Sequence, residues 1–186
     1  KTLGEVTKII MGQSPKGETY NTQNKGLPLI NGPVEFGPNQ LSKTHITKYT
    51  TKPTKICNEG DLILCVRGST TGRTNIAGQK SCLGRGVASI SANNEIKQPL
   101  VNIFIAAMRN QIFRLGRGST FPNISRDDIK KILITVPPLN QQEELLKTLE
   151  RLSTQTQQLE SIYKQKLILL EELRKSILTK AFNGGL

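Results

Sequence analysis

Three short turns in this sequence combine arginine with glycine and hydroxyl side chains. The segment Arg-Gly-Ser-Thr occurs at residues 67–70 and again at 117–120, and Gly-Arg-Gly lies between them at residues 84–86. Backbone N–H groups, hydroxyls and a guanidinium on such turns can donate hydrogen bonds to phosphate oxygens. An arginine can also bridge the O6 and N7 acceptors of guanine. The alternative is that these are solvated loops whose arginines cover apolar surface.

The sequence contains no recognisable catalytic motif. The segment from Gly68 to Arg73 resembles a phosphate loop, but it is one residue short and lacks the lysine. Val136-Pro137-Pro138-Leu139 lacks the asparagine with which adenine methyltransferases hold a flipped base. His45 is the single histidine, and the three cysteines have no metal-ligand spacing. We therefore expect no catalytic residues, no metal site and no cofactor in this chain.

The positive charge is concentrated in the first three quarters of the chain. The formal net charge is +12, and residues 1–138 carry 19 Lys and Arg against 8 Asp and Glu. Such an excess favours a polyanionic partner. Aromatic residues make up only 4%, with no Trp, whereas single-strand binders usually stack bases on aromatic rings. Double-stranded DNA is therefore the favoured partner. No apolar run approaches the roughly 20 residues of a membrane span, so no membrane partner is expected.

The candidate DNA-binding residues come from the three turns and from nearby basic, hydroxyl and aromatic positions. The lysines between Leu41 and Ile56 are expected to form a diffuse electrostatic surface rather than to read bases. The full set of candidates is Lys16, Tyr20, Lys43, Lys48, Arg67, Ser69, Thr70, Arg73, Arg85, Arg117, Ser119 and Thr120.

Residues 1–138 are predicted to form a mixed, β-rich domain. Short apolar segments alternate with turn residues, which is typical of strands. One helix is expected from Pro99 to about Phe113, and a shorter one from Ser125, where Asp128 completes a capping box. Strands are expected at residues 6–11, 27–30, 61–66, 86–90 and 132–136.

Residues 139–186 are predicted to form one long coiled-coil helix. No Gly or Pro occurs from Gln141 to Phe182, Asn140 is the expected N-cap, and apolar residues recur at alternating steps of four and three. The predicted fold class is thus α+β, a β-rich mixed domain followed by a long C-terminal coiled-coil helix. The predicted interface positions are Leu145, Leu149, Leu152, Leu159, Tyr163, Leu170, Leu173 and Ile177.

Such a helix requires a partner. About 42 residues form a rod of roughly 60 Å, which is too long for the first domain to cover. The partner helix could belong to a second copy, to another part of a longer chain or to another subunit. The alternative, a helix folded back on its own domain, is opposed by its length and by Pro137-Pro138.

Several motifs, in order, resemble the specificity subunit of Type I restriction–modification enzymes. They begin with Leu3-Gly4-Glu5-Val6 and Gly12-Gln13-Ser14-Pro15, continue through residues 60–68 and 118–129, and reach the Pro-Pro-Leu-x-x-Gln junction at 137–142. The apolar pattern of residues 169–186 is similar to the end of the family's spacer helix.

This resemblance implies a target recognition domain, residues 1–138, and a spacer and dimerisation helix, residues 139–186. Such subunits are not enzymes. They read one half of a bipartite DNA site and pair their spacer helices antiparallel, either between two copies or between two halves of one subunit. They dock methyltransferase subunits, which bind S-adenosylmethionine, and through them restriction subunits. The odd number of cysteines argues against a disulfide scaffold, so reduced thiols and a cytoplasmic location are expected.

Two other interpretations remain open at this point. The chain could be an enzyme, or a specificity domain detached from a fused methyltransferase or nuclease, although the motifs for donor binding and metal chemistry are missing. It could also be a protein-interaction adaptor in which the coiled coil is the function and the positive charge is incidental.

Overall fold

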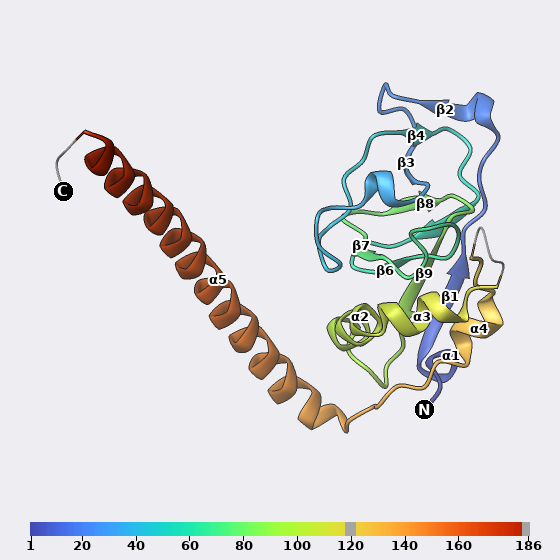
Figure 1. Cartoon of the computed structure of the whole chain (residues 1–186). Helices are drawn as coiled ribbons and strands as arrows, with labels where there is room; N and C mark the ends of the chain where they lie inside the picture. The colour runs from blue at the N-terminus through green and yellow to red at the C-terminus, as the bar shows by residue number, and fades with distance from the viewer. Residues whose placement is uncertain (118–121, 184–186) are drawn as a thin grey trace. The chain divides into compact units, whose positions relative to one another are not determined.

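In a computed structural model, the chain divides into two compact units, residues 1–142 and 143–186. The structure describes residues 1–117 and 122–183. The first unit contains two β-sheets and several short helices, and the second consists of a single helical segment (Figure 1). Within the described ranges, no helix is apolar over a long enough stretch to cross a membrane.

The first sheet is antiparallel and has the strand order β1-β9-β6-β7. One of its two inner strands, β6, is buried along its whole length. One face of β6 meets the second sheet, and the other meets helix α2, Gln98–Ala107. The bounds of the strands are β1 Thr7–Met11, β6 Leu62–Cys65, β7 Thr74–Ile76 and β9 Val87–Ala92.

The second sheet is mixed and has the strand order β2-β4-β3-β8-β5. Only the pairing of β3 with β8 is parallel, and the other neighbours run antiparallel. The bounds are β2 Tyr20–Asn21, β3 Leu27–Ile30, β4 Tyr49–Thr50, β5 Lys55–Cys57 and β8 Ser81–Leu83.

A core of small and branched side chains lies between the two sheets. Ile30 and Leu83 from the second sheet pack with Ile63 and Val87 from the first, and all four are fully buried. Successive side chains on a strand point to opposite faces, so Leu62 and Leu64 face away from this core toward α2. The alternation explains why β6 is hydrophobic at every position.

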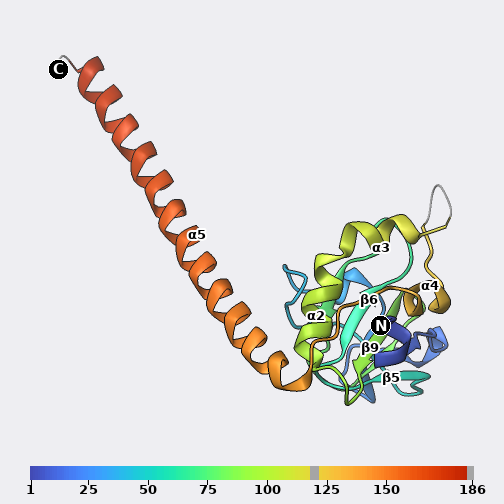
Figure 2. The same ribbon diagram turned by 90° about the horizontal axis from the view of Figure 1, so that it is seen from below.

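Helices α2 and α3 lie on one side of the first sheet (Figure 2). They replace the single predicted helix at residues 99–113, because the backbone turns at Met108, where φ is −84° and ψ is 8°. The helical segments of the first unit are α1 Leu3–Val6, α2 Gln98–Ala107, α3 Arg109–Leu115 and α4 Arg126–Lys130, with two 3₁₀ turns, η1 Gly17–Thr19 and η2 Pro33–Glu35.

The short helix predicted at Ser125 is confirmed, and the strand predicted at residues 132–136 is wrong. The Ser125 hydroxyl accepts the Asp128 amide at 3.2 Å, and Asp128 completes the capping box. Residues 132–136 instead form one isolated bridge, between Leu133 and Thr2. The chain then reaches Pro137, which has no N–H to continue a ladder.

Helix α5, Leu139–Phe182, begins at the first residue of the predicted segment, one residue before the predicted N-cap Asn140. The carbonyl of Pro138 accepts the amides of Gln141 at 2.9 Å and Gln142 at 3.2 Å, so Asn140 lies inside the first turn and is not the N-cap. The two sheets of the first unit and this long C-terminal helix agree with the α+β class expected from the sequence.

The Gln142 side chain connects the first turn of α5 to other residues of the first unit through hydrogen bonds. Its side chain is fully buried. Its Oε1 accepts the Lys97 amide at 2.8 Å, and its Nε2 donates to the carbonyls of Glu95 and Pro137, both at 2.8 Å. Three of the four hydrogen-bonding directions of this side-chain amide are therefore used inside the protein.

We expect Gln142→Ala to lower the free energy of unfolding by about 1–3 kcal/mol, because it removes a buried side chain and the partner of three part-buried backbone groups. Urea denaturation followed by circular dichroism measures the loss. Gln141→Ala is the matched control, since Gln141 is exposed and its truncation should cost less than about 0.5 kcal/mol. Equal losses for the two variants would contradict this role of Gln142.

Candidate nucleic-acid interface

The fold brings two of the arginine turns together. Arg67 follows the end of β6, and Arg85 precedes the start of β9. These strands are antiparallel neighbours with Cys65 opposite Val87, and the Val66 amide donates to the Gly86 carbonyl at 3.0 Å. Two turns separated by about twenty residues in sequence are therefore adjacent in space.

The third turn joins the first through the segment at Pro122–Asn123. Asn123 forms β-bridges with both Arg67 and Arg117, and its amide and carbonyl each pair with Arg117 at 3.0 Å. The Gly68 amide donates to the Pro122 carbonyl at 2.9 Å. The main chain at Arg117 thus lies beside the Arg67 turn.

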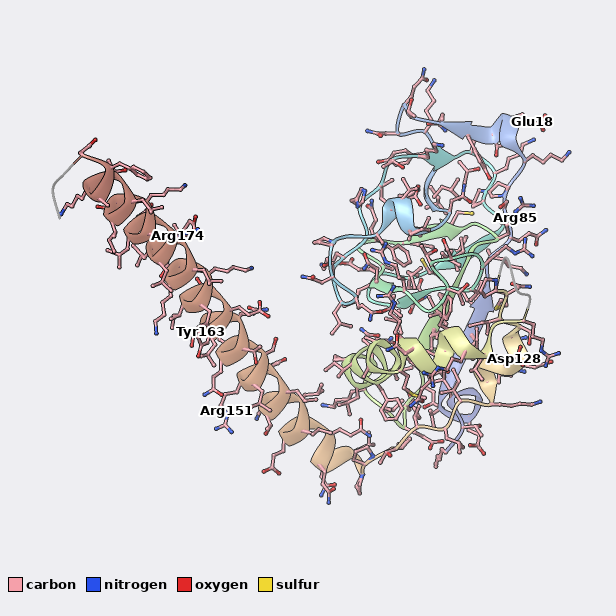
Figure 3. The ribbon with its side chains drawn as sticks, viewed as in Figure 1. Glu18, Arg85, Asp128, Arg151, Tyr163 and Arg174 are labelled. Atoms are coloured by element: carbon pink, nitrogen blue, oxygen red, sulfur yellow. The ribbon has the colours of Figure 1, made fainter. Side chains whose placement is uncertain are left out.

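A cleft of about 620 Å³ opens where the turns meet. Four of the predicted DNA-binding residues line it, namely Tyr20, Lys48, Arg67 and Arg85. Figure 3 shows Arg85 at the edge of the first unit, where its side chain is exposed. In the part of the chain that the structure describes, no carboxylate forms an ion pair with Arg67 or Arg85, so both guanidinium groups can bind an anion.

Three other candidates have partners inside the protein. The Arg73 guanidinium lies 5.9 Å from the centre of the Phe36 ring. Arg117 contacts the Asp128 carboxylate at 3.4 Å, and Lys43 contacts Glu59 at 3.6 Å. Hydrogen bonds from Ser125 lower the pKa of Asp128, so that carboxylate stays ionised beside Arg117. Arg117 and Lys43 remain largely exposed, so these pairs are weak.

Three further candidates, Lys16, Ser69 and Thr70, do not line the cleft. Lys16 is exposed at the start of η1, and Ser69 is exposed in the Arg67 turn. Thr70 is half-buried, and its side chain acts to lower the pKa of the neighbouring Cys65 thiol. Ser119 and Thr120, which were predicted as contacts, lie outside the described residues.

Sequence reasoning missed several residues that line the cleft, among them Asn31, Val34 and Glu35. The Asn-Gly-Pro run at 31–33 indicated a turn but no role in binding. Glu35 is only 3% exposed, and its carboxylate accepts hydrogen bonds from backbone amides of its own turn. The signal that could have found it is a lone acidic residue directly after a Gly-Pro turn in a basic region.

The buried thiols argue against cysteine chemistry in this unit. Burial raises the pKa of Cys57 to about 12 and that of Cys65 to about 11, so both stay protonated at neutral pH. Thiolates, not thiols, attack substrates and bind metals. Over residues 1–117 and 122–183, no group of three or more His, Cys, Asp or Glu side chains could hold a metal ion. The arrangement in this region suits binding of an anion by guanidinium and ammonium groups.

Helix α5 carries a second candidate interface. Its predicted positions follow one another along the helix, and Leu152, Leu159, Tyr163 and Leu170 are each at least half exposed. Leu145, Leu173 and Ile177 are 39–56% exposed, and Leu149 is partly exposed. So many apolar side chains on one exposed helix indicate a surface that a partner covers.

Two polar residues interrupt this apolar stripe, and both have partners on the helix itself. The Thr156 hydroxyl donates to the Leu152 carbonyl at 2.9 Å. The Lys166 ammonium lies 5.8 Å from the centre of the Tyr163 ring. Polar residues at such positions often fix the register and partner choice of a coiled coil at a cost in stability.

Comparisons with known proteins agree with this geometry. A family model described as "Type I restriction modification DNA specificity domain" matches residues 1–169. The putative type I restriction enzyme MjaX specificity subunit of Methanocaldococcus jannaschii is 34% identical over 181 residues. That alignment covers 95% of this chain but 40% of the relative, so the chain spans less than half the length of this relative.

Solved structures show the same fold. A chain from a study of complex assembly and conformational transition in the type I R-M system superimposes with a TM-score of 0.83 and 31% identity. The HsdS subunit of Thermoanaerobacter tengcongensis gives a TM-score of 0.80 with 29% identity. Both similarities cover 100% of this chain and 45% of the other.

The family description and the name of the curated relative both designate specificity, not catalysis, which agrees with the expected non-catalytic role. The resemblance that the sequence motifs indicated is confirmed. The match over most of the residues, the curated relative and the shared fold together show that this chain belongs to the family of Type I restriction–modification DNA specificity domains.

Proposed function

We propose that this chain recognises double-stranded DNA in a sequence-specific manner, as a non-catalytic part of a Type I restriction–modification complex. The observation that carries the proposal is the cleft in which Arg67, Arg85 and Lys48 converge without a neutralising ion pair among the described residues. Phosphate contacts supply much of the affinity of such an interface, and base-edge contacts supply its specificity.

One domain of this size reads one half of a bipartite site. Helix α5 then pairs antiparallel with a second spacer helix and sets the distance between two half-sites. The exposed apolar stripe supports this part of the proposal, because it requires a helical partner. That partner belongs to a second copy of the chain or to another part of a longer subunit.

The same helix docks the methyltransferase subunits, and through them the restriction subunits. In this scheme S-adenosylmethionine binds to the methyltransferase subunits, whereas this chain contributes only the recognition of the target. The complex acts on DNA in the cytoplasm. The family and the exposed apolar surface of α5 support this assembly.

We expect binding of the purified chain to random duplex DNA to weaken steeply with salt. If five to eight phosphates are neutralised, a plot of log affinity against log salt has a slope of about −5 to −7. Filter binding across a salt series measures it. A flat response would contradict DNA binding and favour the protein-interaction adaptor.

Arg67→Ala is expected to weaken duplex binding and to reduce the magnitude of that slope by about one, as loss of one phosphate contact does. Arg151→Ala is the matched control, because Arg151 is an exposed arginine on α5 outside the apolar stripe (Figure 3). Arg117→Ala should have a smaller effect, since Asp128 already pairs with that guanidinium. A wild-type slope in Arg67→Ala argues against a phosphate contact there.

The double variant Leu159→Asp with Leu170→Asp should abolish assembly through α5, since it places carboxylates in the apolar stripe. Sedimentation equilibrium compares its molecular mass with that of the wild type. Gln158→Asp with Gln165→Asp adds the same charge on the opposite side of the helix and should assemble normally. If the first variant keeps the wild-type mass, the interface on α5 is wrongly drawn.

A further inference from the structure

The Arg85 turn packs against Asn31 so closely that only glycine fits on either side of the arginine. A Cβ atom on Gly84 would lie 1.8 Å from the Asn31 Oδ1, and one on Gly86 would lie 2.6 Å from the Asn31 carbonyl oxygen. The Gly84 amide also donates to the Ile30 carbonyl at 2.8 Å. The main chain around Arg85 is thus held against the end of β3.

The opposite side of the same turn is also held. The Arg85 amide donates to the Ser14 hydroxyl at 3.1 Å, and the Gly12 amide donates to the Val87 carbonyl at 2.9 Å. A Cβ on Gly12 would lie 2.1 Å from the Gly84 carbonyl oxygen. The backbone of Arg85 is therefore fixed from two sides, and only its side chain extends into the cleft.

A buried carboxylate fixes the turn that faces Arg85. The Oε2 atom of Glu35 accepts the amides of Asn31 at 3.1 Å and Gly32 at 3.2 Å, and its Oε1 accepts the Thr47 hydroxyl at 3.1 Å. Burying a charge is costly unless hydrogen bonds compensate, and here they do. The turn holds Val34, which is 71% exposed and is one of the residues that line the cationic cleft.

The two turns form one rigid unit because Asn31 belongs to one and contacts the other. Arg85 therefore differs from two other candidate arginines, because its main chain is fixed while its guanidinium forms no ion pair with any described residue. Arg73 lies over the Phe36 ring, and Arg117 is paired with Asp128. A phosphate contact tolerates a flexible side chain, whereas reading a base edge needs a donor pair in a set position. Rigid support of Arg85 therefore favours base reading.

We propose that Arg85 and Val34 are the specificity-determining residues of the cleft. Arg85 donates two hydrogen bonds to O6 and N7 of a guanine, and Val34 packs against the C5-methyl group of a thymine in the same half-site. This assignment rests on the proposed function, since it requires duplex DNA in the cleft. Glu35 and Asn31 act as positioning residues that hold the two side chains in place.

Binding selection from a random duplex library, with the purified full chain, tests the assignment. The wild type should select a half-site with at least one fixed guanine and one fixed thymine. Arg85→Lys should lower the preference for that guanine by about 5- to 150-fold and keep the salt dependence, because lysine retains the charge but not the rigid planar donor pair of a guanidinium. Arg151→Lys is the control and should select the wild-type half-site.

Base analogues test the same contacts without changing the protein. Replacing the selected guanine by 7-deazaguanine should weaken wild-type binding but leave Arg85→Lys unaffected. Replacing the selected thymine by uracil removes one methyl group and should weaken the wild type about fourfold, a change to which Val34→Ala should be insensitive. These paired losses would support the assignment.

Two results overturn the proposal, and they are distinguishable. If the chain binds duplex DNA but Arg85→Lys and Val34→Ala select the wild-type half-site, the residue assignment is wrong while DNA recognition stands. If the wild type binds no duplex at any salt concentration, the proposed function fails together with the assignment.

Discussion

The antiparallel pairing of β6 with β9 is the constraint on which the recognition surface depends. Because Cys65 lies opposite Val87, the turn leaving one strand and the turn entering the other must emerge at the same end of the sheet. The buried side chains of β6 hold this register from both faces, because Ile63 packs against the second sheet and Leu62 and Leu64 face α2. Arg67 and Arg85 share a cleft because the core beneath them allows one pairing.

Gly84 and Gly86 serve close packing in this surface rather than backbone flexibility. Gly84 and Gly86 are needed for close approach to Asn31, because neither position has room for a Cβ atom. The consequence is a turn whose main chain is packed as tightly as a core element although its arginine side chain is exposed. Rigidity and exposure are thereby combined at one residue.

Local patterns predicted the elements of the chain better than the contacts between them. The apolar run at 27–30 coincides with β3, and the capping box at Ser125 starts α4, because both depend on neighbouring residues. Residues 132–136 have a strand-like composition but pair with only one bridge, and no local signal reports the number of available partners. The turn at Met108 is likewise invisible in the apolar periodicity of residues 99–113.

The same distinction between local sequence patterns and long-range contacts applies to the candidate site. Arginine in glycine-rich turns could be identified from sequence, and four predicted residues do line the cleft. The roles of Asn31 and Glu35 depend on packing against residues far along the chain, so composition and spacing could not reveal them. Arg73 was predicted as a DNA contact, but it lies over the Phe36 ring, a long-range contact that spacing in the sequence does not indicate.

The separation of scaffold from exposed side chains has a consequence for how new target preferences can arise. Backbone packing at glycines and the buried Glu35 carboxylate support the two turns, whereas the side chains of Val34, Arg67 and Arg85 contribute little to the core. Exposed substitutions typically change stability by less than about 0.5 kcal/mol. Evolution can therefore exchange these three side chains with little loss of folding, so one scaffold is able to diversify into readers of different sequences.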